Sequence, residues 1–405
     1  MAVGSDDLGT LHAVAGVRMA AVSAGIKKAG RLDVVLFELA ETSVTGGVFT
    51  TNAFCAAPVT LCKQHLAQTA PRYLLINTGN ANAGTGAPGL QAAQSCCEAL
   101  ATAANISANA VLPFSTGVIG ELLPAAKINA VIGNALTELQ GNDWHKVARG
   151  IMTTDTRPKA CSRQLQIAGK TITITGISKG AGMIKPNMAT MLGYVFTDIG
   201  MTVTQVQTCV RKAADLSFNR ITIDGDTSTN DCCMLVATGA SGVQFDKLNA
   251  AEQQRFTTEL EAVFITLATA IVRDGEGATK FVTIRIEGGA TVQECLQVGY
   301  AIGESPLVKT ALFASDPNWG RILAAVGRAG LQKLQVDNIE IWLDDVNIVR
   351  NGARAATYTE AAGQSVLSLA EFSIIVKLGR GNCNETLWTC DFSHDYVTIN
   401  AEYRT

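Results

Sequence analysis

The sequence predicts a mixed α/β protein. Apolar strand-like runs recur along its 405 residues, and segments with helical periodicity lie between them. The runs mix strict alternation with continuous apolar stretches, which indicates sheets covered by helices on at least one face. Because 47% of the residues are hydrophobic and 17% are charged, the chain has enough apolar material for a large core.

Each expected element follows from its residue pattern. Runs rich in β-branched and other apolar residues predict strands at 32–38, 72–77, 171–177, 281–286, 339–344 and 372–378. Apolar residues at helical spacing predict helices at 90–104, 203–217, 249–272 and 291–303. Gly and Asn predict a loop at 77–89, NTGNANAGTGAPG. That loop lacks the Lys-Ser/Thr ending of a phosphate-binding P-loop, so an ordered active-site loop and a plain turn both stay open.

Net charge, apolar runs, cysteines and histidines argue against several classes of function. A net charge of −3 argues against a general nucleic-acid binder. No apolar run is long enough for a transmembrane helix, and the N-terminus lacks the pattern of a signal peptide, so we expect a cytoplasmic protein without membrane attachment. Eleven cysteines without a C-x-x-C motif are predicted to be buried thiols in a reducing compartment. The four histidines are scattered, and we expect neither a metal site nor a catalytic histidine.

The stretch KGAGMIKPNMATML, residues 179–192, has the layout of a self-cleaving site, because a small residue, Ala189, precedes a hydroxyl residue, Thr190. A threonine hydroxyl needs a base to become a nucleophile. Cleavage between the two residues would make Thr190 an N-terminus whose α-amine, with a pKa of roughly 7.7–8.0, could be that base. Taken alone, residues 188–196 also fit an ordinary apolar strand.

Other blocks of the sequence accompany this stretch, namely NTGNANAGTG (77–86), STGVIG (115–120), MTTDT (152–156), DGDTSTND (224–231), RDGEGATK (273–280), SDPNWGRI (315–322) and the ending NAEYRT (400–405). In order and over nearly the whole chain, these blocks resemble the motifs of the ornithine acetyltransferase family, the ArgJ type of glutamate N-acetyltransferase. The number of blocks makes the resemblance highly specific.

The resemblance implies a fold and an organisation. We expect a layered α/β sandwich of the DmpA/ArgJ-like type, similar to N-terminal-nucleophile hydrolases in arrangement but not in connectivity. We also expect an α fragment, 1–189, and a β fragment, 190–405, that remain one folded unit and assemble into oligomers of αβ units. The first fragment carries 15 Lys and Arg against 10 Asp and Glu, and the second 17 against 25. Such opposite net charges would help the fragments stay together, although a chance asymmetry explains them equally well.

The resemblance also implies roles for individual residues. Thr190 is the expected nucleophile, and Thr116 and Gly117 the expected oxyanion-hole pair. The expected substrate-binding residues, besides Thr190, are Thr153, Lys179, Glu276, Asn400 and Thr405. Thr154 stays open as an alternative to its neighbour. Lys179 can hold a carboxylate and Glu276 an ammonium group, so together they suit an amino-acid substrate.

The implied reaction moves acetyl from N-acetylornithine to glutamate through an acetyl-Thr190 intermediate and releases ornithine for arginine synthesis. No cofactor is expected, and acetyl-CoA is a candidate second acetyl donor, so a bifunctional enzyme is the preferred form. One alternative is a self-processing amidohydrolase or aminopeptidase of the same fold, which typically has serine at the position of Thr190. The other is a non-enzymatic binding protein in which residues 179–192 form an ordinary turn and strand.

Overall fold

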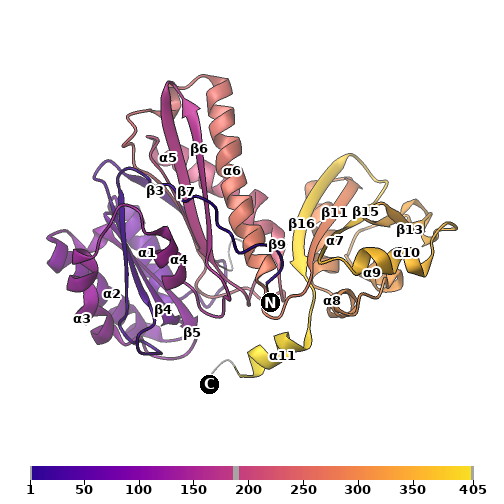
Figure 1. Cartoon of the computed structure of the whole chain (residues 1–405), viewed down its shortest axis with the longest axis horizontal. Helices are drawn as coiled ribbons and strands as arrows, with labels where there is room; N and C mark the ends of the chain where they lie inside the picture. Colours follow the sequence, from indigo (N-terminus) through magenta and orange to yellow (C-terminus); the bar gives the residue numbers. More distant parts are fainter. Residues whose placement is uncertain (1, 186–190, 403–405) are drawn as a thin grey trace.

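The computed structural model describes residues 2–185 and 191–402 (Figure 1). Its strands form three sheets. The first has the order β1 (Val17–Val22), β2 (Val34–Leu39), β4 (Tyr73–Asn80), β5 (Val111–Val118). The second has the order β3 (Val44–Phe49), β10 (Cys232–Ala237), β8 (Leu192–Thr197), β7 (Lys170–Lys179), β6 (Lys159–Ile167). The third has the order β14 (Ala353–Arg354), β13 (Val346–Arg350), β12 (Glu340–Leu343), β15 (Glu371–Lys377), β11 (Phe281–Gly289), β16 (Cys383–Cys390), β9 (Ile221–Thr222).

The helices of the described residues are α1 (Ala57–Gln68), α2 (Gly86–Ala104), α3 (Ala125–Thr137), α4 (Trp144–Gly150), α5 (Val203–Leu216), α6 (Ala250–Arg273), α7 (Val292–Gly303), α8 (Pro306–Phe313), α9 (Trp319–Gly327), α10 (Glu360–Leu367) and α11 (His394–Ala401). The long helix α6 begins at a capping box formed by Asn249 and Glu252, which satisfies free backbone donors of its first turn. Its buried residues, from Phe256 to Val272, recur every three or four positions and face the second sheet.

The first two sheets pack face to face, with helices on both outer sides (Figure 1). Their shared core is aromatic. The ring of Phe37 lies 4.8 Å from that of Phe196, and Phe114 meets Tyr194 edge to face at 5.2 Å. Helices α2 and α3 cover the far side of the first sheet, and α5 and α6 cover the far side of the second. This helix–sheet–sheet–helix order confirms the layered α/β sandwich that the family resemblance implied.

The second sheet contains strands from both sides of position 190. Strands β3, β6 and β7 precede that position, whereas β8 and β10 follow it. Strand β8 pairs with β7 on one side and with β10 on the other, and β10 pairs with β3. The two parts of the chain therefore share one hydrogen-bonded sheet and its two cores.

The third sheet belongs to a separate cluster of apolar residues at the C-terminal end of the chain. Strand β11 pairs in parallel with β15 and antiparallel with β16, and α7 packs on β11 and β16. Figure 1 shows this part to one side of the sandwich, with α11 returning beneath it toward the first sheet. This return matters because α11 carries Asn400.

All six predicted strands and all four predicted helices are present, with ends that differ by a few residues. The loop predicted at 77–89 is too long. Strand β4 continues to Asn80 because its backbone stays paired with β5, and α2 already begins at Gly86, so the connection is only residues 81–85. None of the helices in the described ranges combines the length and apolarity needed to cross a membrane.

The eleven cysteines are all free thiols. Eight of them are buried, as predicted. Cys55, Cys209 and Cys383 are partly exposed instead, because they lie at the rims of their cores.

Candidate active site

A cavity of about 280 Å³ lies where the first two sheets meet the C-terminal helix. It collects segments from distant parts of the chain: the ends of β5 and β7, the start of β8, the loop before β10, the loop after α6, and α11. Six predicted site residues line it, namely Thr116, Gly117, Thr153, Lys179, Glu276 and Asn400. Thr154 lines it too, so the choice between the two threonines stays open.

Ala189, Thr190 and Thr405 lie outside the described residues. The residues that directly follow Thr190 are described, and both Met191 and Leu192 line the cavity. The Met191 carbonyl accepts a hydrogen bond of 3.0 Å from the Cys232 amide at the start of β10. Met191, which directly follows Thr190 in the sequence, is thus part of the cavity wall.

Thr116 and Gly117 lie at the end of β5, beside the end of β4. Gly117 has φ +136°, and a Cβ atom there would overlap the backbone of Gly79 and Asn80. Only glycine allows the two strands to approach so closely. The Thr116 hydroxyl accepts a hydrogen bond of 3.3 Å from Lys179 Nζ. A backbone amide and a hydroxyl at the cavity wall are donors of the kind that stabilise an oxyanion.

Lys179 is the last residue of β7, and its side chain is buried. Burial lowers its pKa, because the charged ammonium loses water, and the nearby carboxylate of Asp155 opposes that shift. Asp231 and Glu276 add weaker attraction. The cavity thus holds a buried cation whose charge depends on surrounding carboxylates, which suits the binding of a substrate carboxylate.

Glu276 meets the C-terminal helix inside the cavity. Its carboxylate accepts a hydrogen bond of 2.8 Å from Asn400 Nδ2, and its amide donates one of 2.8 Å to the Ala181 carbonyl. A Cβ atom on Gly182 would overlap the Glu276 carboxylate, so that position needs glycine for this close approach. Glu276 is buried yet lines the cavity, which leaves a carboxylate available to a substrate ammonium.

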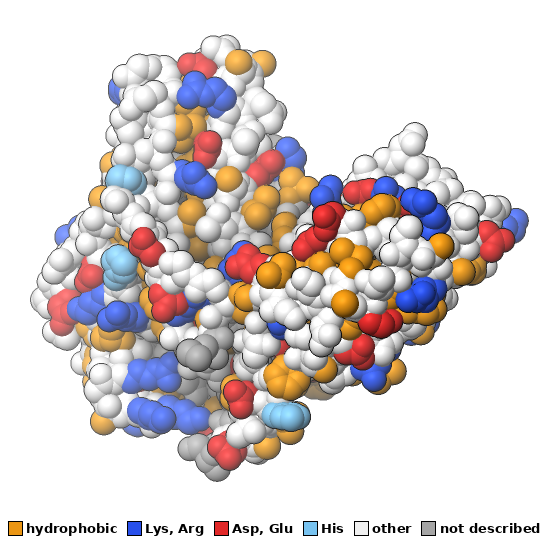
Figure 2. All heavy atoms as spheres, turned by 45° about the vertical axis from the view of Figure 1, so that its right-hand side comes forward, with side chains coloured by type: hydrophobic (Ala, Val, Ile, Leu, Met, Phe, Trp, Pro, Cys, Tyr) orange, Lys and Arg blue, Asp and Glu red, His pale blue; other side chains and the backbone are white. Residues whose placement is uncertain are grey.

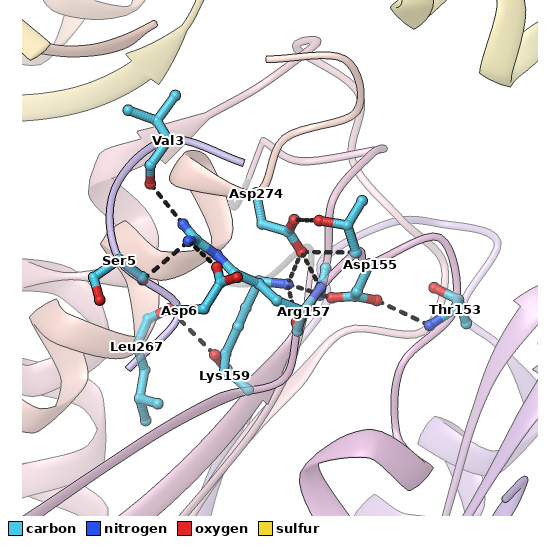
Figure 3. A network of polar contacts seen from close by, with 12 residues as sticks. Val3, Ser5, Asp6, Thr153, Asp155, Arg157, Lys159, Leu267 and Asp274 are labelled. Atoms are coloured by element: carbon cyan, nitrogen blue, oxygen red, sulfur yellow. Dashed lines mark hydrogen bonds and ion pairs between the residues drawn. The ribbon is translucent and has the colours of Figure 1, made fainter. Parts of the chain in front are cut away.

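A buried ionic network supports the wall that carries Thr153 (Figure 3). The carboxylate of Asp155 accepts hydrogen bonds from the Thr153 amide at 2.9 Å, the Gly180 amide at 2.7 Å and Lys159 Nζ at 2.6 Å. Lys159 also pairs with Asp274 at 2.6 Å. Burial would raise the pKa of Asp155, but the charges of Lys159 and Lys179 outweigh it, and the pKa lies below its usual range. The network therefore fixes Thr153 and the end of β7 together.

The same network anchors the N-terminal segment. Arg157 Nη2 donates to the Val3 carbonyl at 2.6 Å, and its Nη1 pairs with Asp6 at 2.7 Å (Figure 3). Arg157 directly follows Thr156, whose amide and hydroxyl donate to Asp274. The segment that holds Thr153 is thereby tied to both α6 and the start of the chain.

Sequence reasoning assigned no role to two polar residues of the cavity, Asn230 and Asp231. Asn230 Nδ2 donates to the carbonyls of Ala81 and Ser115, which joins the loop before β10 to the first sheet. Asp231 is buried, burial raises its pKa, and its Oδ2 has no hydrogen-bond partner among the described residues. Both residues belong to the block DGDTSTND, and their position in that motif is the sequence feature that could have identified them.

Comparison with known proteins decides the family. The model of the ArgJ family matches residues 18–405, nearly the whole chain. The chain belongs to the ArgJ family. Its sequence is 59% identical over 408 residues to the arginine biosynthesis bifunctional protein ArgJ of Pseudomonas fluorescens, with 100% of both chains covered. The predicted family is confirmed, and with it an acyltransferase of arginine biosynthesis.

Solved structures of the ArgJ family are also similar to this chain. The arginine biosynthesis bifunctional protein ArgJ of Bacillus halodurans is 35% identical, with a TM-score of 0.49 and coverage of 52% of this chain and 99% of that one. The ornithine acetyltransferase of Mycobacterium tuberculosis complexed with ornithine is 34% identical, with a TM-score of 0.38 and coverage of 44% of this chain and 93% of that one.

Proposed function

We propose that this ArgJ-family chain cleaves itself between Ala189 and Thr190 and then transfers acetyl from N-acetylornithine to glutamate. The supporting observation is that six residues from five motifs line one cavity, together with Met191, the residue that follows Thr190. In this proposal the α fragment is 1–189 and the β fragment is 190–405. The shared second sheet is a physical reason for the fragments to remain one folded unit.

Cleavage is the first step. The Thr190 Oγ attacks the Ala189 carbonyl carbon, and an ester bond forms as the peptide C–N bond breaks. Water then hydrolyses the ester, which leaves a carboxylate on Ala189 and a free α-amine on Thr190. That amine is the base that a threonine nucleophile needs.

Transfer follows by a ping-pong route. The Thr190 Oγ attacks the acetyl carbonyl of N-acetylornithine while the α-amine takes the hydroxyl proton. The Thr116 hydroxyl and the Gly117 amide stabilise the oxyanion, and ornithine leaves with the proton. The amine of glutamate then attacks the acetyl-Thr190 ester, which yields N-acetylglutamate and restores the hydroxyl.

Charges in the cavity orient the amino acids. Lys179 binds a substrate carboxylate, and Glu276 binds an ammonium group and is itself held by Asn400. Thr153 contributes a hydroxyl from the wall that Asp155 fixes. Thr405 is proposed to close the same site from the end of the chain. No cofactor takes part, and oligomers of αβ units in the cytoplasm are the proposed form of the enzyme.

Product analysis tests the function. Purified protein is incubated with N-acetylornithine and glutamate, and ornithine and N-acetylglutamate are expected in equal amounts. A parallel reaction with acetyl-CoA as the only donor is expected to yield N-acetylglutamate as well, which tests the bifunctional form. Release of acetate or hydrolysis of peptide amides, with no acetyl on glutamate, would instead favour an amidohydrolase.

A further inference from the structure

A second cavity of about 230 Å³ adjoins the candidate active site. The two cavities share four lining residues, Gly117, Val118, Thr153 and Thr154. The second cavity is lined by three cationic residues, Lys27, Lys28 and Arg31, with Glu402 as its acidic residue. We call this cavity the basic annex. A molecule whose reacting atoms lie at Gly117 can therefore extend into either cavity.

Hydrogen bonds fix the position of the loop that lines the annex. The loop joins β1 to β2, and the Asp33 carboxylate accepts hydrogen bonds of 2.6 Å from the amides of Ala24 and Ile26. Arg31 Nη2 donates to the carbonyls of Met152 at 2.8 Å and Thr153 at 3.0 Å. The loop and the wall that carries Thr153 are thus one bonded unit.

The loop that carries Lys28 and Arg31 lies close to the C-terminal helix, since Ile399 and Glu402 line the same cavity. The loop between β1 and β2 lies at the same end of the molecule as α11 (Figure 1). Figure 2 shows Lys and Arg side chains gathered at the lower left of the molecule, over the lower end of the N-terminal layers. Lys28 is exposed and makes no ion pair with any described residue, so its charge is available to a ligand.

The ends of the two cavities that lie away from their shared residues carry opposite charges. In the active-site cavity, the Glu276 carboxylate lies beside Asn400 on the side of α11. Among the described residues that line the annex, three are cationic and one, Glu402, is acidic. The proposed donor and acceptor show the same opposition, because the side chain of ornithine ends in an ammonium and that of glutamate in a carboxylate. The Glu276 end of the active-site cavity carries a negative charge and cannot favour both side chains.

We infer that the basic annex binds the side-chain carboxylate of the acceptor, through Lys28 and Arg31, while Glu276 binds the side-chain ammonium of the donor. This inference rests on the proposed function. Both amino acids present their reacting nitrogen or acetyl group at Gly117, and their side chains extend in different directions. The annex repels the ammonium of ornithine and Glu276 repels the carboxylate of glutamate, so each side chain has one favourable direction.

Steady-state kinetics on Lys28→Gln and Lys28→Glu test the inference. The KM for glutamate is expected to rise about threefold in the first variant and about tenfold in the second, because these variants remove and reverse an exposed charge. The KM for N-acetylornithine is expected to change less than about twofold. The matched control is Lys247→Gln, because Lys247 is an exposed lysine on another surface, paired with Asp246 at 3.6 Å.

A neutral acceptor adds a readout that a general structural defect would not change. The wild type is expected to prefer glutamate over glutamine, which has the same shape without the charge, and Lys28→Glu is expected to lose most of that preference. Equal changes for donor and acceptor, an unchanged KM for glutamate, or a change confined to acetyl-CoA as donor would each overturn the inference. A wild type that transfers no acetyl to glutamate would overturn the proposed function as well.

Discussion

Asn400 on the C-terminal helix donates a hydrogen bond of 2.8 Å to the carboxylate of Glu276, a residue 124 positions earlier in the chain. The bond brings the last helix onto the wall of the cavity. A chain terminus usually frays unless contacts hold it, so this contact gives α11 a reason to be ordered. It also fixes the position of the one carboxylate to which we assign the substrate ammonium.

Substitution of Gly182 tests the placement of Glu276. In Gly182→Ala, the added methyl group overlaps the Glu276 carboxylate and must displace it. We expect kcat/KM for N-acetylornithine to fall about tenfold or more, as expected for loss of an interaction with a charged group. The control is Gly133→Ala on α3, where a Cβ meets no neighbouring atom within 4 Å. Equal activity of both variants would contradict the placement.

Substitution of Thr116 tests the oxyanion hole. Thr116→Val keeps the shape of the side chain and removes the hydroxyl. We expect kcat to fall by about 10²–10³, because one oxyanion donor is typically worth that much, while KM changes little. Thr116→Ser, which restores the hydroxyl, is expected to recover most of kcat. A valine variant with nearly normal kcat would remove the hydroxyl from the mechanism.

The pH dependence of substrate binding tests Lys179. Burial lowers the pKa of Lys179 below its ordinary value of 10.5, so its ammonium loses the proton at lower pH than an exposed lysine does. KM for a carboxylate substrate is therefore expected to rise as the pH increases through that lowered pKa. In Lys179→Arg the guanidinium stays charged, so the rise should move to higher pH. KM profiles that coincide in wild type and variant would show that another group titrates.

The buried pairs of Lys159 are expected to stabilise the fold. Lys159→Met leaves the carboxylates of Asp155 and Asp274 buried without their cation. Removing one partner of a buried pair costs about 3–5 kcal/mol of unfolding free energy, which denaturant titration measures. In Lys247→Met, which removes an exposed pair with Asp246, the loss should be about 0–1 kcal/mol. Similar losses of unfolding free energy in both variants would mean that the buried network stabilises the fold no more than an exposed ion pair does.

Acid should weaken the same network. The pKa of Asp155 is lower in the folded protein than in the unfolded chain, where it is about 3.9. Its contribution to stability is therefore complete above the unfolded pKa and is lost as the pH falls toward the lower folded pKa. Asp155→Asn should flatten the dependence of the unfolding free energy on pH in this acid range. An unchanged slope would argue against an ionised Asp155.

Periodicity in the sequence predicted strands and helices, and the resemblance to a known family implied the layered sandwich and six of the residues that line the cavity. Neither could predict how segments meet. The approach of Asn400 to Glu276 depends on where α11 packs, and nothing local in NAEYRT indicates that packing.

Supporting and neighbouring residues were also missed for physical reasons. Asp155 and Lys159 are ordinary charged residues in the sequence, and only the folded chain buries them beside Asp274. Lys28 and Arg31 belong to the surface loop before β2, and their relation to Gly117 arises from the pairing of β2 with β4 and of β4 with β5. The loop at 77–89 was overestimated because Gly and Asn composition cannot reveal that β4 stays paired through Asn80.

The central claim is that Thr190 becomes an N-terminal nucleophile by cleavage of the chain. Intact-mass measurement of the purified protein, beside Thr190→Ala, tests it most directly. We predict two wild-type fragments that correspond to residues 1–189 and 190–405, and a single inactive chain of 42.5 kDa for the variant. An active wild type that remains one 42.5 kDa chain, or a variant that is still cut at this bond, would contradict the account.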